Sequence, residues 1–379
     1  MLPLSAAAAE VIRTSHQINR RVTAYTDTQG ALVLDDVADA TVACDLKSAI
    51  RRTATAAIAN PNLWPANPND VLSEVSSEIG IEYGIVVPRA GTEWLTVFRG
   101  PIQTVKAGVL DVRAPDPLLG GYSRYQVSGL AVTASARAQR VVDYRLPSPI
   151  KTIPGPVVNE IIRLIQLGDP GAEVLDTTGG DASTAASIEI DKDLWGEGIL
   201  KLAASAGLTV DNAPSGVYRI RKIPTLDDPP VWRIDAGGVL VSADLERTRA
   251  GVYNAVQVTN GRTDGTPTVS ELVVDDDPAS PTFWGGRFGR KTRFYANPAI
   301  TTRDQAIRAG RGLLAKARGI SCTVTLTAVP NGALEEGDVV EVDLGDGRLQ
   351  LHILDSFGVP LTPAAQALTT RSLELPAEQ

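Results

Sequence analysis

The amino-acid sequence predicts a mainly β protein in which a small α+β insert lies between two β-barrel halves. Three observations predict this class. Short strand-like runs recur between Ile18 and Arg113, and they recur again after Tyr253. Between these two regions, helical patterns end at glycines and lead into a hairpin. Many short strands separated by glycine and proline are typical of barrels and sandwiches.

Composition limits both the size and the role of the chain. Its 379 residues are enough for two or three domains with separate cores. The net charge of −8 argues against a nucleic-acid-binding surface as its main role. No apolar run approaches the about 20 residues that span a bilayer, and the N-terminus lacks the basic leader of a secretory signal. We therefore expect a protein without a membrane segment that is made and assembled in a cytoplasm.

Residues 1–147 form the first predicted domain, an N-terminal β-barrel. Polar and apolar residues alternate from Ile18 to Ala24, which predicts a half-buried strand. A proline-stiffened loop from Asn60 to Asp70 separates the earlier strands from the later ones. The further predicted strands are 31–34, 41–47, 51–59, 81–87, 94–99 and 109–113.

Residues 148–234 form the predicted α+β insert. The proline-rich stretch from Leu146 to Pro156 is the clearest linker in the chain. A helix follows it, because proline is well tolerated at the first helical position, and Gly168 ends this helix. Asp193 can cap a second helix that ends at Gly207, and a hairpin comes next.

Residues 235–379 form the predicted C-terminal β-barrel, and the stretch from Leu272 to Arg318 is its most informative part. Two prolines stop a strand there, and Thr302 and Gln305 then form the capping-box pattern of a helix start. Gly319 lies where a left-handed helix cap belongs. The chain has no short repeat of fixed period, but its two halves could be distant copies of each other. The predicted strands are 253–259, 268–274, 322–327, 339–344, 349–355 and 369–375.

Asp275, Asp276 and Asp277 are the most obvious candidates for a metal site. Calcium loops supply oxygen ligands at alternating positions around a glycine turn and end on a glutamate. Here the three acids are consecutive, and Pro278 follows them. We therefore expect a solvated turn that keeps a strand edge from pairing with another chain.

Glu335, Glu336 and Glu93 are the candidate carboxylates of a glycoside hydrolase. Such an enzyme places two acids about 5–10 Å apart, and sequence alone does not establish that distance. The first two lie in a turn that leads into a strand, which favours a structural role.

Other catalytic motifs are missing from the sequence. No glycine pattern has the spacing of a phosphate loop, and no serine lies in a nucleophile elbow. His16 precedes a strand, and His352 alternates with three apolar residues, which predicts that it lies on the opposite face at a surface or interface. Cys44 and Cys322 lack metal or redox spacing, so we expect buried, reduced thiols in different domains.

Three stretches resemble parts of bacteriophage tail-tip and baseplate hub proteins. Val42 to Ala59, closed by Asn60-Pro61, resembles the N-terminal barrel of siphophage minor tail proteins from actinobacterial phages. Trp195 to Arg221 resembles the α+β unit between the hub barrels. Asp277 to Gly289, the capped helix after it, and Leu334 to Val340 resemble the second barrel. The order of these parts over nearly the whole chain carries the resemblance.

The resemblance implies a structural virion protein that is not an enzyme. Hub proteins of this kind are homotrimers with two tail-tube-like barrels per chain. They close the tail tube and adapt its sixfold symmetry to a threefold tip. The implied partners are a distal tail or tail tube protein, the tape measure protein and other minor tail or tip proteins. Genomic DNA would pass through the channel without specific binding, and the protein would reside in the virion after assembly in the host cytoplasm.

We accordingly expect no catalytic residue, no cofactor and no metal ion. Arg51 and Arg52, a basic pair within a strand, are expected to be salt-bridged or to face the tube rather than to bind nucleic acid. Two other functions stay open. A tail-associated cell-wall or polysaccharide hydrolase would act on the host envelope. A receptor- or carbohydrate-binding tail protein would need exposed aromatic platforms, and only 5% of the residues are aromatic.

Overall fold

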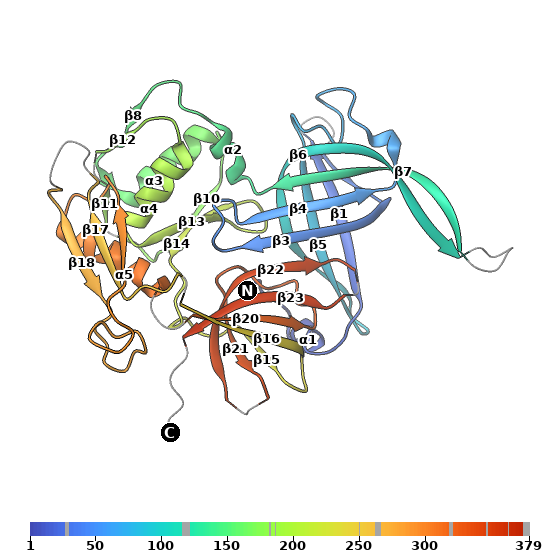
Figure 1. The fold of residues 1–379 in the computed structure, drawn as a ribbon. Coiled ribbons are helices and arrows are strands. Elements are labelled where there is room, and N and C mark those ends of the chain that lie inside the picture. Colours follow the sequence, from blue (N-terminus) through green and yellow to red (C-terminus); the bar gives the residue numbers. More distant parts are fainter. Residues whose placement is uncertain are drawn as a thin grey trace.

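A computed structural model describes residues 1–26, 30–115, 122–181, 183–185, 187–249, 251–261, 267–317, 321–345, 348–362 and 364–373. The fold is mainly β with an α+β insert, as predicted. Figure 1 shows the N-terminal strands in blue, the insert in green, a separate sheet with its helix in orange, and the C-terminal strands in red.

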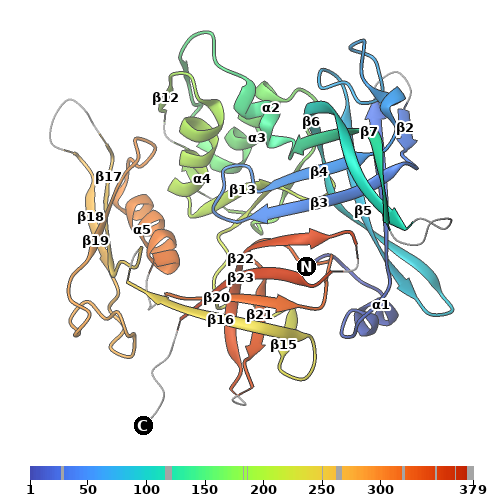
Figure 2. The ribbon, with the colours of Figure 1, turned by 45° about the vertical axis from the view of Figure 1, so that its right-hand side comes forward.

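Within the described residues, one large sheet of 13 strands contains strands from both ends of the chain. β22 pairs with β3, and this pairing joins the last half of the chain to the first (Figure 2). Among the described residues, the path of strands ends at β16 and β2 without closing on itself, so barrel closure stays a prediction. The strands of the sheet follow the order β16 (Leu240–Thr248), β20 (Ser321–Ala328), β23 (Gln366–Leu373), β22 (Gln350–Pro360), β3 (Val37–Asp45), β4 (Arg52–Ile58), β7 (Tyr122–Ser135), β6 (Gly91–Pro115), β5 (Glu78–Val87), β1 (Ile18–Thr26) and β2 (Gly30–Val33). Two further strands branch from this path, since β21 (Val339–Asp343) pairs with β22 and β15 (Trp232–Asp235) pairs with β21.

The two halves of this sheet repeat one strand order. The first half runs β3-β4-β7-β6-β5-β1, and the last half runs β16-β20-β23-β22-β21-β15. Each strand of the first set has a counterpart at the same place along the chain in the second set. The sixth strand alone differs in direction, because β1 is antiparallel to β5 whereas β15 is parallel to β21.

The pairing registers repeat as well. A bulge interrupts β3 at Val37–Asp39, and a bulge interrupts β16 at the counterpart, Leu240–Ser242. A second bulge lies at Ile102–Thr104 in β6 and at Leu354–Ser356 in β22. Bulges are specific, position-dependent features of a sheet. Their coincidence supports the interpretation that the two halves are copies of one motif.

The hydrophobic core of the large sheet is shared by both halves. Ile81 and Leu130 from the first half and Leu326 and Leu354 from the last belong to one cluster of buried side chains. Gly332 lies against the face of the Tyr83 ring, where an added Cβ atom would come within 2.4 Å of a ring carbon. The division at residues 147 and 234 stays a prediction, but the two halves do not have separate cores.

The insert has a core of its own, around Ile161 and Trp195. The predicted cap is confirmed, since Asp193 accepts a hydrogen bond from the Gly196 amide at 2.9 Å. Gly207 ends the following helix with a left-handed φ of 74°. The helical elements of the insert are α2 (Ala138–Asp143), α3 (Val157–Gly168), a π-helical turn η2 (Leu194–Leu200) and α4 (Lys201–Ser205). Its sheet has the order β10 (Val174–Asp176), β14 (Tyr218–Lys222) and β13 (Leu208–Asn212). Two short strand pairs complete it, β8 (Ile150–Lys151) with β12 (Glu189–Ile190) and β9 (Gly155–Pro156) with β11 (Thr184–Ala185).

A third unit corrects the expectation that every strand after Tyr253 belongs to the C-terminal barrel. β17 (Ala255–Thr259), β18 (Ser270–Val274) and β19 (Thr292–Ala296) form a sheet of their own, and α5 (Arg303–Ala317) covers one face of it. This unit sits in the chain between β16 and β20 and lies beside the insert (Figure 1).

The capping box of α5 is confirmed. The backbone amide of Thr302 donates to Gln305 Oε1 at 3.1 Å, and the amide of Gln305 donates to Thr302 Oγ1 at 3.3 Å. Gly319, the expected cap at the other end, lies outside the described residues. The described part of the chain also contains the helix α1 (Ala6–Val11) and the 3-10 turn η1 (Pro61–Leu63).

Candidate functional site: a buried charge network between three parts of the chain

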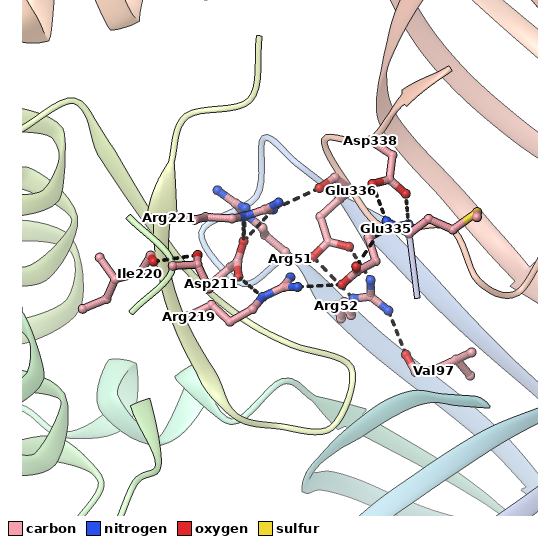
Figure 3. A network of polar contacts seen from close by, with 12 residues as sticks. Arg51, Arg52, Val97, Asp211, Arg219, Ile220, Arg221, Glu335, Glu336 and Asp338 are labelled. Atoms are coloured by element: carbon pink, nitrogen blue, oxygen red, sulfur yellow. Dashed lines mark hydrogen bonds and ion pairs between the residues drawn. The ribbon is translucent and has the colours of Figure 1, made fainter. Parts of the chain in front are cut away.

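The largest group of buried charges lies where the first half, the insert and the C-terminal half meet (Figure 3). We call it the central charge network. β4 supplies Arg52, with Arg51 directly before it, the hairpin β13–β14 supplies three members, and the turn before β21 supplies three more. Its members are Arg51, Arg52, Asp211, Arg219, Arg221, Glu335, Glu336 and Asp338, together with the amino group of Met1.

Asp211 is the acceptor at the centre of the network. Its side chain is fully buried and forms ion pairs with Arg51, with Arg219 at 2.9 Å and with Arg221 at 2.7 Å. Burial alone would raise the pKa of Asp211, but the positive charges of Arg221, Arg51 and Arg219 together hold it below its ordinary value. The carboxylate therefore stays ionised and fixes the insert to the start of β4.

Arg52 and Glu336 form the most deeply buried ion pair. Their side chains are 2% and 0% exposed, and Arg52 Nη2 lies 2.7 Å from Glu336 Oε2. Arg52 Nη1 also donates to the Val97 carbonyl at 2.9 Å. Burial opposes the charge on Arg52, yet Glu336 raises the pKa of the guanidinium above its ordinary value. The pair links the two halves of the large sheet through charge as well as through apolar packing.

Glu335 and Asp338 complete the network on the C-terminal side. Arg219 Nη1 lies 2.7 Å from Glu335, and the amino group of Met1 lies 2.7 Å from Asp338. Burial would raise the pKa of Glu335, but Arg219 and the amino group of Met1 lower it below its usual range. For Asp338, burial outweighs the attraction of that amino group and raises the pKa. Both carboxylates have structural partners, which favours the structural role predicted for this turn.

A second polar cluster joins the insert to the first sheet. Glu78 accepts hydrogen bonds from Arg99 at 3.0 Å, from Arg137 at 2.7 Å and from Arg140 at 3.0 Å. Burial opposes its ionisation, but these guanidinium groups lower the pKa of Glu78. The cluster lines an open, polar cavity of about 770 Å³. Arg140 also reaches Asp169, which accepts a hydrogen bond from the Tyr218 hydroxyl at 3.0 Å.

The predicted charged site residues lie in the central charge network, at the start of α1 and in the turn after β18. Arg51 and Arg52 are salt-bridged, which is one of the two arrangements predicted for them, and they meet Glu335 and Glu336 in the central charge network. Glu93 lies elsewhere and accepts hydrogen bonds from the Ser5 amide and hydroxyl at the start of α1.

Asp275 corrects the expectation of a fully solvated acidic turn. Its side chain is 1% exposed and accepts hydrogen bonds from Ser280 Oγ at 2.5 Å and Thr282 Oγ1 at 2.7 Å. Asp276 and Asp277 are exposed, as expected. Pro278 and Pro281 turn the chain back, so that the two hydroxyls reach a carboxylate that the sequence pattern placed in solvent.

His352 corrects a second expectation, since it is buried rather than at a surface. Its Nδ1 atom lies 2.9 Å from Thr370 Oγ1, and burial lowers its pKa to about 4. Leu349 and Leu351, expected on the buried face, are 51% and 38% exposed. Ile353, the third apolar residue of the run, is buried as expected at 4% exposure, so both faces of β22 are buried from His352 to Asp355. The hydroxyl of Thr370 on the neighbouring strand makes burial of the imidazole acceptable.

Sequence reasoning missed Asp211, Arg219 and Arg221. Arg219 and Arg221 alternate with the buried Tyr218 and Ile220 along β14, and Asp211 lies directly opposite Arg219 in the hairpin. That alternation of charge within an apolar hairpin was the available signal.

Cys44 is a buried free thiol, as expected, and burial raises its pKa to about 12. The side chain of Cys322 lies outside the described residues. Both cysteines belong to strands of the large sheet.

Among the described residues, no three His, Cys, Asp or Glu side chains are grouped so as to hold a metal ion. The expectation that the chain has no catalytic, cofactor or metal site stays a prediction. In the same part of the chain, no helix is long and apolar enough to cross a membrane.

No family model matches the chain, and no curated protein matches its sequence. Solved structures do match over nearly its full length. A tail protein from Neisseria meningitidis MC58 has a TM-score of 0.60 at 14% identity, over 94% of this chain and 97% of that one. The 43 kDa tail protein of prophage MuSo2 from Shewanella oneidensis has a TM-score of 0.58 at 12% identity, over 95% and 100%.

A third match is the prophage tail protein gp18 from Listeria monocytogenes EGD-e, with a TM-score of 0.56 at 9% identity, over 94% of this chain and 95% of that one. All three matches extend through the large sheet, the insert and the third unit, since each covers more than nine tenths of both chains. At these identities the likeness concerns the fold alone, and the chain has the fold of prophage tail proteins.

Proposed function

We propose that the chain is a structural hub of a phage tail tip or baseplate, which closes the tail tube and adapts its sixfold symmetry to a threefold tip. One observation carries the proposal. A chain with the fold of tail proteins contains the same strand order and the same bulges twice. Three copies of a chain with two such halves offer six similar surfaces to a sixfold tube, and closed rotational symmetry is the usual form of such assemblies.

The proposed partners follow from that position. One face of the homotrimer would bind a distal tail or tail tube protein, and the tape measure protein and other minor tail or tip proteins would complete the tip. Genomic DNA would pass through the ring without specific binding, because a net charge of −8 repels its phosphates. The protein would reach the virion by assembly in the host cytoplasm.

The central charge network supports a structural rather than an enzymatic role. Its carboxylates hold three parts of the chain together through ion pairs with arginines. A hydrolase would instead need one protonated and one free carboxyl group facing a substrate.

Electron microscopy of virions labelled with gold-bound antibody against this chain tests the proposal. We expect label at the distal end of the tail. Label along the tube, on the capsid or absent from the particle would overturn it.

A further inference from the structure

We propose that β6 of one copy pairs with β16 of the next copy, and that this pairing repeats between chains the join that β22 and β3 make within the chain. The number of copies in the resulting ring, three, rests on the proposed function. The strands and their register rest on the internal repeat alone.

The bulges define which residues correspond in the two halves. Aligning the bulge at Ile102–Thr104 with the bulge at Leu354–Ser356 makes β6 the counterpart of β22. Aligning Val37–Asp39 with Leu240–Ser242 makes β3 the counterpart of β16. The same alignment also makes β4 the counterpart of β20 and β7 the counterpart of β23. The β4–β7 pairing and the β20–β23 pairing then have the same register.

Within the chain, β22 and β3 pair antiparallel, with Gly358 opposite Ala43 and Val359 opposite Val42. The counterparts of these residues are Lys106 and Ala107 on β6 and Glu246 and Leu245 on β16. The repeat therefore predicts an antiparallel pairing between copies, in which Lys106 lies opposite Glu246 and Ala107 lies opposite Leu245.

The edges that this pairing needs are open in the described part of the single chain. Among the described strands, β16 is the last of the large sheet and pairs with β20 alone, and only Leu240 at its start makes a further single bridge, to Ala236. β6 pairs with β5 as far as Pro101, and beyond that residue its strand partner among the described residues is β7, on the other side. The β6–β7 hairpin projects from the body of the molecule, which leaves this edge accessible (Figure 1).

Exposure identifies the same surfaces independently. Val42 and Val359, which meet in the join within the chain, are 0% and 1% exposed. Leu245, the counterpart of Val42, is 55% exposed, and Ala107, the counterpart of Val359, is also exposed. An apolar side chain on an open edge strand invites pairing with another chain. Pairing with a second copy would bury Leu245 and Ala107, just as Val42 and Val359 are buried where β22 pairs with β3.

The charges on the two strands favour a second copy of this chain as the pairing partner. Lys106 and Glu246 are both exposed, and directly opposite residues of opposite charge stabilise an antiparallel pair. Because β6 and β16 are different surfaces of one chain, the contact is head-to-tail. Such a contact closes into a ring when the rotation between copies allows it.

Interchain crosslinking tests the register. One preparation carries Ala107→Cys and the other carries Leu245→Cys, and the two are mixed, assembled and oxidised. Since the two positions are exposed, neither substitution should prevent folding. We expect a disulfide-linked dimer in the mixture and none in either preparation alone. The matched control replaces Leu245→Cys with Val241→Cys, about 13 Å further along the same strand and beyond the reach of a disulfide.

A charge exchange tests the same pair without cysteines. Lys106→Glu or Glu246→Lys should each weaken assembly roughly fivefold, and the double exchange should restore it. Assembled trimers that crosslink equally at the control position, or not at all, would overturn this interface and leave the proposed hub standing. A chain that stays monomeric at every concentration would contradict both the interface and the trimeric hub.

Discussion

At the scale of single residues, buried charges decide how the protein responds to substitution and to pH. Arg52 and Glu336 are almost completely shielded from water, so each depends on the other to offset the loss of hydration. Arg21 and Glu82 form an ion pair of similar length, 3.1 Å, but with side chains 39% and 25% exposed. Water competes with that pair and reduces its contribution to stability.

Replacing Arg52 by methionine should lower the free energy of unfolding by about 3–5 kcal/mol, because Glu336 is left buried and unpaired. Arg21→Met, the matched surface control, should cost less than about 1 kcal/mol. Denaturant unfolding of the two variants measures the difference. Adding Glu336→Leu to Arg52→Met should recover most of the loss. Equal losses for both single variants would contradict the buried-pair account.

His352 should make the protein less stable as the pH falls. Its pKa is about 4 in the folded chain and 6.5 when exposed, so the unfolded chain binds a proton first on acidification. The free energy of unfolding should therefore fall between pH 6.5 and pH 4, by at most roughly 3 kcal/mol, and no further below that window. The cause is the burial of the imidazole.

His352→Gln keeps a hydrogen-bonding side chain beside Thr370 but removes the titration. Unfolding measured from pH 7 to pH 4 should show a shallower decline in this variant than in the natural protein. Loss of the charges on Asp211 and Glu335 acts on both proteins alike and cancels in the comparison. Parallel declines would show that His352 does not titrate on unfolding.

The sequence predicted that Arg51 and Arg52 are salt-bridged or face the tube, but it did not predict their partners. The partner carboxylate of Arg52 is 284 residues away along the chain, and no local pattern relates two positions so distant. The burial of His352 was missed for a related reason. The hydroxyl that makes it acceptable belongs to Thr370 on a neighbouring strand, and a single strand's alternation does not reveal its neighbour.

At the scale of elements, close contacts hold the two halves of the large sheet together. The loop before β21 packs its Gly332 backbone against the Tyr83 ring on β5. Tyr83 is fully buried, so the ring has no space into which it can withdraw.

Gly332→Ala should destabilise the protein by about 1–3 kcal/mol, because the added methyl group would overlap the Tyr83 ring. Gly358→Ala in β22 is the control, because an added Cβ atom there meets its nearest neighbour only at 3.9 Å. That control should change stability by less than about 1 kcal/mol. Thermal unfolding of the two variants compares them, and a neutral Gly332→Ala would contradict the close approach.

Local signals predicted the elements better than their pairing. Asp193, Gly207 and the Thr302–Gln305 capping box each depend on hydrogen bonds within a few residues, and each is confirmed. The separate sheet of β17, β18 and β19 was assigned to the barrel instead. Strand patterns do not encode which sheet a strand joins, since that depends on packing against α5.

At the scale of the whole molecule, the large sheet contains one strand motif twice. This internal repeat is the feature of the fold on which the proposed pseudo-sixfold symmetry depends. The chain has the fold of prophage tail proteins over more than nine tenths of its length, with the third unit inserted between two strands of the second copy. In the proposed function this plan would serve as a scaffold, whose parts are held together by ion pairs between buried carboxylates and arginines.

The purified chain should accordingly show no hydrolytic activity on bacterial cell wall. Glu335 and Glu336 are both engaged by arginines, and Glu93 lies apart from them. A dye-release assay on purified peptidoglycan measures turnover, with lysozyme as the positive control. Activity that survives repurification and disappears in Glu335→Gln would contradict this expectation.

Cryo-electron microscopy of the assembled tail tip tests the central claim most directly. We predict a ring of three chains in which six similar sheets surround the axis, with β22–β3 joins inside chains alternating with β6–β16 joins between them. Six chains in the ring, or two halves of one chain placed without a pseudo-sixfold relation, would contradict the account even if the protein proved to be part of the tail.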